Sequence, residues 1–159
     1  MKSLMKLVGI LLLIILAAGG GFLAAKLGVG SRVETVNLPD VERQFAERMQ
    51  NVALVGAFTV TGREDRAPRE DHYDISSVEK VGDDQWRFNA KIGELGVTLP
   101  IVVTMKFAGD TPIVTITDFT IPTLGTFTAR VFFYGDRYAG TWQHGQVGGH
   151  MFGKIEKHS

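Results

Sequence analysis

Cysteine is absent from the 159 residues of the chain, and its absence excludes several classes of protein. Without cysteine there is no disulfide scaffold, no thiol nucleophile, no cysteine-ligated zinc site and no cysteine to carry a lipid anchor. The length fits about one domain, on the usual scale of roughly 100 to 200 residues per domain.

A net charge is also absent, because 17 basic residues balance 17 acidic ones. Three of the basic residues, Lys2, Lys6 and Lys26, lie within the first thirty positions, which hold no acidic residue. The rest of the chain is therefore slightly acidic. Since phosphate binding requires a clustered positive field, we expect no nucleic-acid partner.

Motifs of catalysis and of cofactor binding are missing as well. The chain has no nucleophile elbow, no paired-histidine zinc motif, no glycine-rich dinucleotide loop and no EF-hand loop. Residues Gly148–Lys154 have the spacing of a phosphate-binding loop, but Ile155 stands where that loop requires serine or threonine. We therefore expect a non-catalytic protein without a cofactor.

One long apolar run is present, from Leu7 to Ala25, and it contains 19 uncharged residues. This length is just sufficient to cross a bilayer as a helix, so residues 1–29 are predicted to form a transmembrane anchor. A cleaved secretory signal is the alternative, because small residues at Ala17–Gly21 follow the most apolar part. The apolar sequence resumes at Phe22, which favours a retained anchor.

Either interpretation of this run exports the rest of the chain. Lys2, Lys6 and the terminal amine precede the run, and Lys26 and Arg32 follow it, so the small excess of positive charge before the run leads us to expect a cytoplasmic amino terminus. We expect the remaining domain to lie in the cell envelope or periplasm, or to be secreted if the leader is cleaved.

A polar linker at 30–37 precedes a segment that has the pattern of an amphipathic helix, 38–51. Asn37 is a candidate cap and Pro39 suits the first turn. The apolar residues at helical spacing are Val41, Phe45, Met49 and Val52. Such a stripe usually packs on the domain that follows.

Residues 52–159 are predicted to form an all-β domain, because the apolar period changes to two and turn residues recur at short intervals. In 97–107 every odd-numbered residue is apolar, and most of the even-numbered residues between them are not. This alternation marks a strand with one buried face. The expected strands lie at about 52–61, 71–81, 85–93, 97–107, 112–121, 126–134, 138–144 and 149–156.

Short turns between these strands predict an antiparallel meander, which closes into an eight-stranded barrel of calycin-like shape or stays an open sandwich. Three features interrupt the regular pattern. Ser76 and Ser77 shift the alternation, the strand at 112–121 is apolar on both faces, and Pro100 falls within a strand. We interpret the first two as bulges or signs of a sandwich, and Pro100 as a sign of an edge or bulge.

His144 and His150 are the only metal-ligand candidates that the sequence brings together. A five-residue loop, 145–149, would place them opposite each other on a hairpin. A metal site would need a third ligand from His72, His158 or a carboxylate, so we expect two solvated histidines and no metal.

The loop Arg63–Asp71 carries four acidic and three basic residues. Mixed charge of this kind usually marks a solvated surface, with a recognition loop at a barrel mouth as the alternative.

The predicted inward face of the barrel is rich in aromatic residues. Such a face either lines a cavity for one apolar ligand or fills a solid core, and eight strands leave room for either. The candidate ligand-binding residues are Trp86, Phe88, Tyr138 and Trp142.

Two resemblances add to this interpretation. Residues 127–154 and the segment FAERMQNVALVGAFTV resemble a family of short, uncharacterised bacterial exported proteins with one N-terminal anchor; the likeness covers about 45–157 and implies no activity. The strands with Gly140-Thr141-Trp142 are more distantly similar to the calycins, barrels that hold small apolar ligands. In those families the Gly-x-Trp motif lies on the first strand, whereas here it falls on the seventh, so no binding residues are transferred.

The sequence therefore favours two functional hypotheses over a third, a metal-dependent or hydrolytic enzyme, for which it shows no catalytic constellation. The first is a membrane-anchored exported barrel that binds a small apolar molecule such as a lipid. The second is a non-catalytic structural or protein-interaction module of the cell envelope with a solid core, whose protein partners the sequence does not identify.

Overall fold

The computed structural model describes residues 32–92, 98–121 and 125–158. The predicted anchor at 1–29 lies outside the described residues. Within the described ranges, no helix combines the length and the apolar character needed to cross a bilayer.

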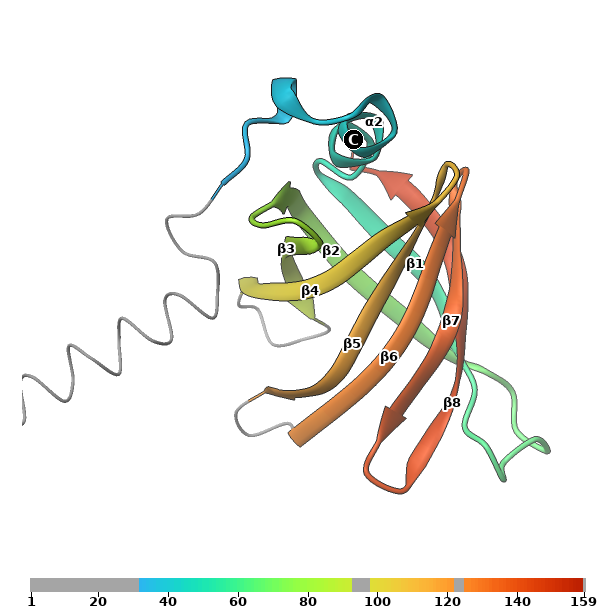
Figure 1. Cartoon of the computed structure of the whole chain (residues 1–159). Helices are drawn as coiled ribbons and strands as arrows, with labels where there is room; N and C mark the ends of the chain where they lie inside the picture. Colours follow the sequence, from blue (N-terminus) through green and yellow to red (C-terminus); the bar gives the residue numbers. More distant parts are fainter. Residues whose placement is uncertain (1–31, 93–97, 122–124, 159) are drawn as a thin grey trace, which may run out of the picture.

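Eight antiparallel strands form a closed barrel, in which each strand pairs with the next and β8 returns to β1 (Figure 1). This arrangement confirms the predicted eight-stranded meander barrel, and the open-sandwich alternative is wrong. Closure pairs the two terminal strands of the meander, so that neither of them is left as an exposed edge strand. The strands are β1 (Val52–Phe58), β2 (Arg69–Lys80), β3 (Gln85–Ile92), β4 (Thr98–Ala108), β5 (Thr111–Ile121), β6 (Gly125–Tyr134), β7 (Arg137–His144) and β8 (Val147–Lys157).

The predicted alternation places the apolar residues inside the barrel. In β3, Trp86, Phe88 and Ala90 are buried, and in β4 the same holds for Val103 and Met105. Successive side chains of a strand point to opposite faces, so a period of two in the sequence becomes one face toward the core.

β2 and β5 each contain the register shift that the irregular alternation predicts. The shifts lie between Ile75 and Ser77 against β3, and between Ile116 and Phe119 against β6. Asp118, within the second shift, has a positive φ of 50°. Because an extra residue changes the parity of a strand, apolar side chains on both sides of a bulge can face the same interior.

Pro100 lies in the half of β4 that has a partner on one side. It is opposite Asn89 of β3, whereas the register between β4 and β5 begins only at Thr104. Proline has no N–H to donate to a ladder, so it is tolerated where the second neighbour is missing. The closed barrel thus has a locally unpaired stretch of β4, as the proline suggested.

One end of the barrel is covered by α2 (Asp40–Arg48), which follows the short 3-10 helix η1 (Thr35–Asn37) (Figure 1). α2 is shorter than the predicted helix at 38–51. Asn37 belongs to η1 instead of capping α2, and Pro39 is the residue before the first turn. After α2, Asn51 adopts a positive φ of 53°, and the chain turns into β1.

The apolar stripe of α2 is narrower than predicted, because Val41 is 38% exposed. Phe45 and Met49 are buried and form the part of the stripe that enters the barrel. The Phe45 ring meets Trp86, Phe107 and Phe133 at centroid distances of 6.4, 6.0 and 5.5 Å. Phe45 therefore fills this end of the barrel.

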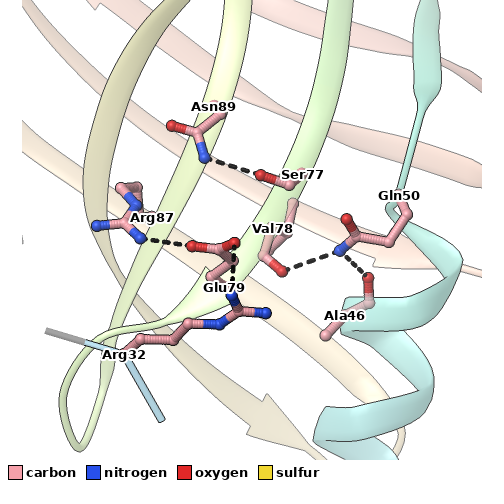
Figure 2. Close-up of polar contacts among 8 residues, drawn as sticks. All are labelled: Arg32, Ala46, Gln50, Ser77, Val78, Glu79, Arg87 and Asn89. Atoms are coloured by element: carbon pink, nitrogen blue, oxygen red, sulfur yellow. Dashed lines mark hydrogen bonds and ion pairs between the residues drawn. The ribbon is translucent and has the colours of Figure 1, made fainter. Parts of the chain in front are cut away.

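Polar contacts fasten α2 to the end of β2. The Lys80 ammonium lies 2.7 Å from a carboxylate oxygen of Glu42, and both side chains are largely buried. Just after α2, the Gln50 amide donates to the carbonyl oxygens of Ala46 and Val78, at 2.7 and 3.2 Å (Figure 2). These bonds satisfy backbone carbonyls at the helix end and fix the helix over the barrel.

Candidate functional site

A cavity of about 250 Å³ occupies the part of the barrel interior that α2 does not fill. Its wall combines aliphatic and aromatic side chains from the middle of the strands and from their ends opposite α2. Among these side chains are Leu54, Tyr73, Phe88, Phe127, Phe133 and Met151. A concave apolar wall of this kind is typical of small-molecule sites.

Three of the four predicted ligand-binding residues, Phe88, Tyr138 and Trp142, line this cavity. Trp86 does not. It is fully buried at the covered end, where its ring contacts Phe45. Trp86 is the first inward residue of β3, so it lies at the level of α2, beyond the cavity.

Tyr138 contributes a polar atom to the largely apolar cavity wall. The residue is 2% exposed, yet its hydroxyl has no hydrogen-bond partner among the described residues. Burial raises the pKa of Tyr138 to about 12, so the hydroxyl is neutral at physiological pH. A buried hydroxyl without a partner is unusual and leaves one donor available in an apolar wall.

Glycines make room for the Tyr138 side chain. A Cβ atom added at Gly56 would lie 2.7 Å from the Tyr138 hydroxyl, and one added at Gly153 would lie 2.7 Å from its ring. These two glycines face each other across β1 and β8. The Tyr138 side chain thus occupies space that side chains at these two positions would fill.

Asp71 lies on the same face of β2 as Tyr73, two residues closer to the uncovered end. Burial raises the pKa of the Asp71 carboxyl, and a hydrogen bond from Tyr73 opposes that rise. The pKa of Tyr73 is raised in turn, first by its own burial and then by the charge of Asp71. The Asp71 carboxyl group therefore lies near the apolar cavity, partly withdrawn from solvent.

A second hollow, of about 370 Å³, lies at the uncovered end of the barrel. Its wall includes Trp142, which also lines the cavity, and three arginines, Arg63, Arg66 and Arg69. The Trp142 indole donates a hydrogen bond to the Thr59 carbonyl oxygen at 3.2 Å. Trp142 therefore lies at the boundary between the apolar cavity and the cationic hollow.

The predicted pairing of His144 with His150 is wrong. His144 is opposite Val147 and His150 is opposite Thr141, so the hairpin has a two-residue turn in place of the expected five-residue loop. The sequence signal for this turn is Gly145, whose φ is 59°. Glycine at the first position of a two-residue turn supplies the positive φ that such hairpins require.

The two histidines take separate partners. The His144 ring stacks on Phe127 with centroids 4.4 Å apart, while His150 lies beside Thr59, with a nitrogen-to-oxygen distance of 3.5 Å. Across the described residues, no group of three or more metal-ligating side chains could hold an ion.

An apolar row crosses the outside of the barrel over β5 to β8. Ile113 is opposite Phe132, Phe132 is opposite Ala139, and Ala139 is opposite Phe152. Ile113, Phe132 and Phe152 are 39, 46 and 47% exposed. Sequence reasoning concentrated on the inward face and missed this outer row, although the alternation of β6 places Phe132 outside.

Comparison of the chain with models of known families, with curated proteins and with solved structures found no match. The resemblances to a family of exported bacterial proteins and to the calycins therefore stay predictions. What is shown is an eight-stranded antiparallel β-barrel.

Proposed function

We propose that the protein is a non-catalytic binding domain that holds one small apolar molecule inside its barrel. The observation that carries this proposal is the cavity of about 250 Å³ lined by Phe88, Tyr138 and Trp142. A cavity walled by apolar side chains stays dry and binds apolar molecules, because water finds too few polar partners there.

The volume of the cavity limits the size of the ligand. An apolar cavity of about 150 Å³ accommodates benzene, so a cavity of about 250 Å³ has room for on the order of ten non-hydrogen atoms. This size suits a medium-length single chain or a small bicyclic compound. A two-chain lipid would enter only by the end of one chain.

The ligand proposal is tested by native mass spectrometry on the full chain, purified in peptide-stabilised discs without detergent, followed by solvent extraction. We expect an adduct of one apolar molecule per chain, or its formation when decanol is added. A clean unbound mass that persists with decanol present would contradict the proposal.

A matched pair of variants locates the bound molecule. Ala129 lines the cavity, so Ala129→Leu fills part of the space and should abolish the adduct. Ala139 lies on the outer face of the neighbouring strand, opposite Phe132, so Ala139→Leu should leave the adduct intact. Equal binding by both variants would place the ligand outside the barrel.

We further propose that residues 7–25 anchor the protein in a membrane and that the barrel lies outside the cytoplasm. The support is the uncharged run of 19 residues preceded by Lys2 and Lys6. In a bacterial host, a tag after Ser159 should be digested in spheroplasts, and the chain should stay in the membrane after carbonate extraction. A tag protected from protease would contradict export, and release by carbonate would contradict anchoring.

The outer apolar row favours a second candidate function, a protein-interaction module of the cell envelope. Exposed patches of large apolar residues often mark interaction surfaces. A photo-crosslinking residue in place of Phe132 should give a protein adduct in intact cells, whereas one in place of Lys91, an outward residue of β3 away from the row, should not. The absence of any protein adduct at the Phe132 position would eliminate this candidate.

A further inference from the structure

The hollow at the uncovered end is lined by the basic residues of the loop Arg63–Asp71 and by none of its acidic residues. Arg63, Arg66 and Arg69 line it, while none of the four acidic residues between Arg63 and Asp71 does. The sequence of this loop has mixed charge, but the fold separates the two signs in space. The wall is therefore positive although the loop as a whole is not.

The three arginines carry no counter-ion from the described chain. No salt bridge of the described residues joins Arg63, Arg66 or Arg69 to a carboxylate. The nearby Glu64 carboxylate instead accepts a hydrogen bond from the Gly62 backbone N–H at 2.8 Å. Guanidinium groups that share one concave wall without an anion favour binding of a carboxylate or phosphate from outside.

The cationic hollow and the apolar cavity are adjacent. Trp142 contributes to both walls, and Phe58 packs edge-on against its ring at a centroid distance of 5.6 Å. On β2, Arg69 and Tyr73 lie on the same face four residues apart, which corresponds to about 13 Å along a strand. A chain of the size that fits the cavity can span this distance.

Asp71 lies midway between Arg69 and Tyr73 on that face of β2, and its charge makes the two ends of the site electrostatically different. Its carboxylate repels a second negative charge from the interior, while the arginines attract one at the mouth. An anionic group is therefore favoured at the mouth and disfavoured inside.

We propose that the ligand is an anionic amphiphile. Its single apolar chain occupies the cavity, and its terminal carboxylate or phosphate binds Arg63, Arg66 and Arg69 at the barrel mouth. This inference rests on the proposed binding function and specifies the chemistry of the ligand.

Fluorine NMR on the full chain in peptide-stabilised discs tests the inference. The chain has two tryptophans, so labelling with fluorinated tryptophan gives one signal at the shared wall, Trp142, and one at the covered end, Trp86. Decanol, decanoate and decyl phosphate each have ten carbon atoms in one unbranched chain and differ in the head group. At low ionic strength we expect the Trp142 signal to report at least about tenfold tighter binding of the two anions than of decanol.

A triple variant, Arg63→Gln with Arg66→Gln and Arg69→Gln, should lose this preference and bind decanol as the unchanged protein does. Its control is the double variant Lys106→Gln with Arg137→Gln, which removes exposed cations elsewhere and should keep the preference. The relative affinity of decanoate and decyl phosphate tells which head group the arginines favour.

The outcomes separate the two proposals. If none of the three compounds moves the Trp142 signal, the proposed binding function fails. If decanol and the anions bind equally, or if the triple variant keeps the preference, the amphiphile inference fails while the binding function stands. Inorganic phosphate alone should bind at least about tenfold more weakly than decyl phosphate; equal binding would make the mouth an independent anion site and overturn the inference.

Discussion

The two ends of the barrel are built from the same strands with the same alternation, yet one is filled and the other is hollow. At the end under α2, Met49 and Trp86 are completely buried and Phe45 is 2% exposed. At the opposite end the inward side chains leave a cavity and an adjacent cationic hollow. The difference lies in the helix, because α2 supplies the apolar side chains that the strands alone lack.

Substitution of Phe45 should give the largest loss of unfolding free energy, because it removes the side chain that fills the covered end of the barrel. Truncation of a buried phenylalanine costs about 3–5 kcal/mol of unfolding free energy, so Phe45→Ala should destabilise the chain by that order. Val41 is 38% exposed on the same helix, so Val41→Ala should change stability by less than about 0.5 kcal/mol. Chemical unfolding followed by near-ultraviolet circular dichroism measures both; equal losses would refute the plugging role of Phe45.

A substitution beside the cavity, Gly56→Ala, should cause the second largest loss of unfolding free energy. The added Cβ would collide with the Phe152 carbonyl oxygen and press on the Tyr138 hydroxyl. We expect a loss of about 1–3 kcal/mol, as for other overpacked sites, measured by the same unfolding experiment. Gly82→Ala is the control, because its Cβ would meet no backbone atom and only the Cβ and Cγ atoms of Gln85, at 3.2 and 3.4 Å. No loss in Gly56→Ala would show that the wall is looser than described.

The smallest change in stability is expected for Asp71→Asn, and this change depends on pH. Burial raises the pKa of this carboxyl in the folded state, so its contribution to stability is present at low pH and is lost as the pH rises through the folded-state pKa. Asp71→Asn should therefore be more stable than the parent at neutral pH, by less than about 1 kcal/mol. The gain should vanish in acid. Thermal unfolding across a pH series measures this difference, and a gain that grows in acid would contradict the assignment.

The strand pattern of the barrel was predictable because side-chain alternation depends on local sequence. The bulge at Ser76 was predictable for the same reason, since an extra residue interrupts the alternation. The position of Trp86 at the filled end was not, because alternation tells which face a residue occupies and not its depth along the barrel. Whether that depth is filled depends on α2, a separate element that covers one end of the barrel.

Two further features depended on details that alternation does not contain. The pairing of His144 was missed because hairpin register follows turn length, and Gly145 sets a two-residue turn. The cationic hollow was missed because the sequence of the charged loop does not reveal that Arg63 and Arg69 share a wall. Both features require the direction of side chains in space.

The central claim is that the hollow half of the barrel takes up an apolar molecule while the filled half does not. Fluorine NMR of the full chain with fluorinated Trp142 and Trp86 measures both halves in one titration with decanol. We expect a saturable shift of the Trp142 signal with an unchanged Trp86 signal. Equal shifts of both signals, or no shift of the Trp142 signal, would contradict this claim.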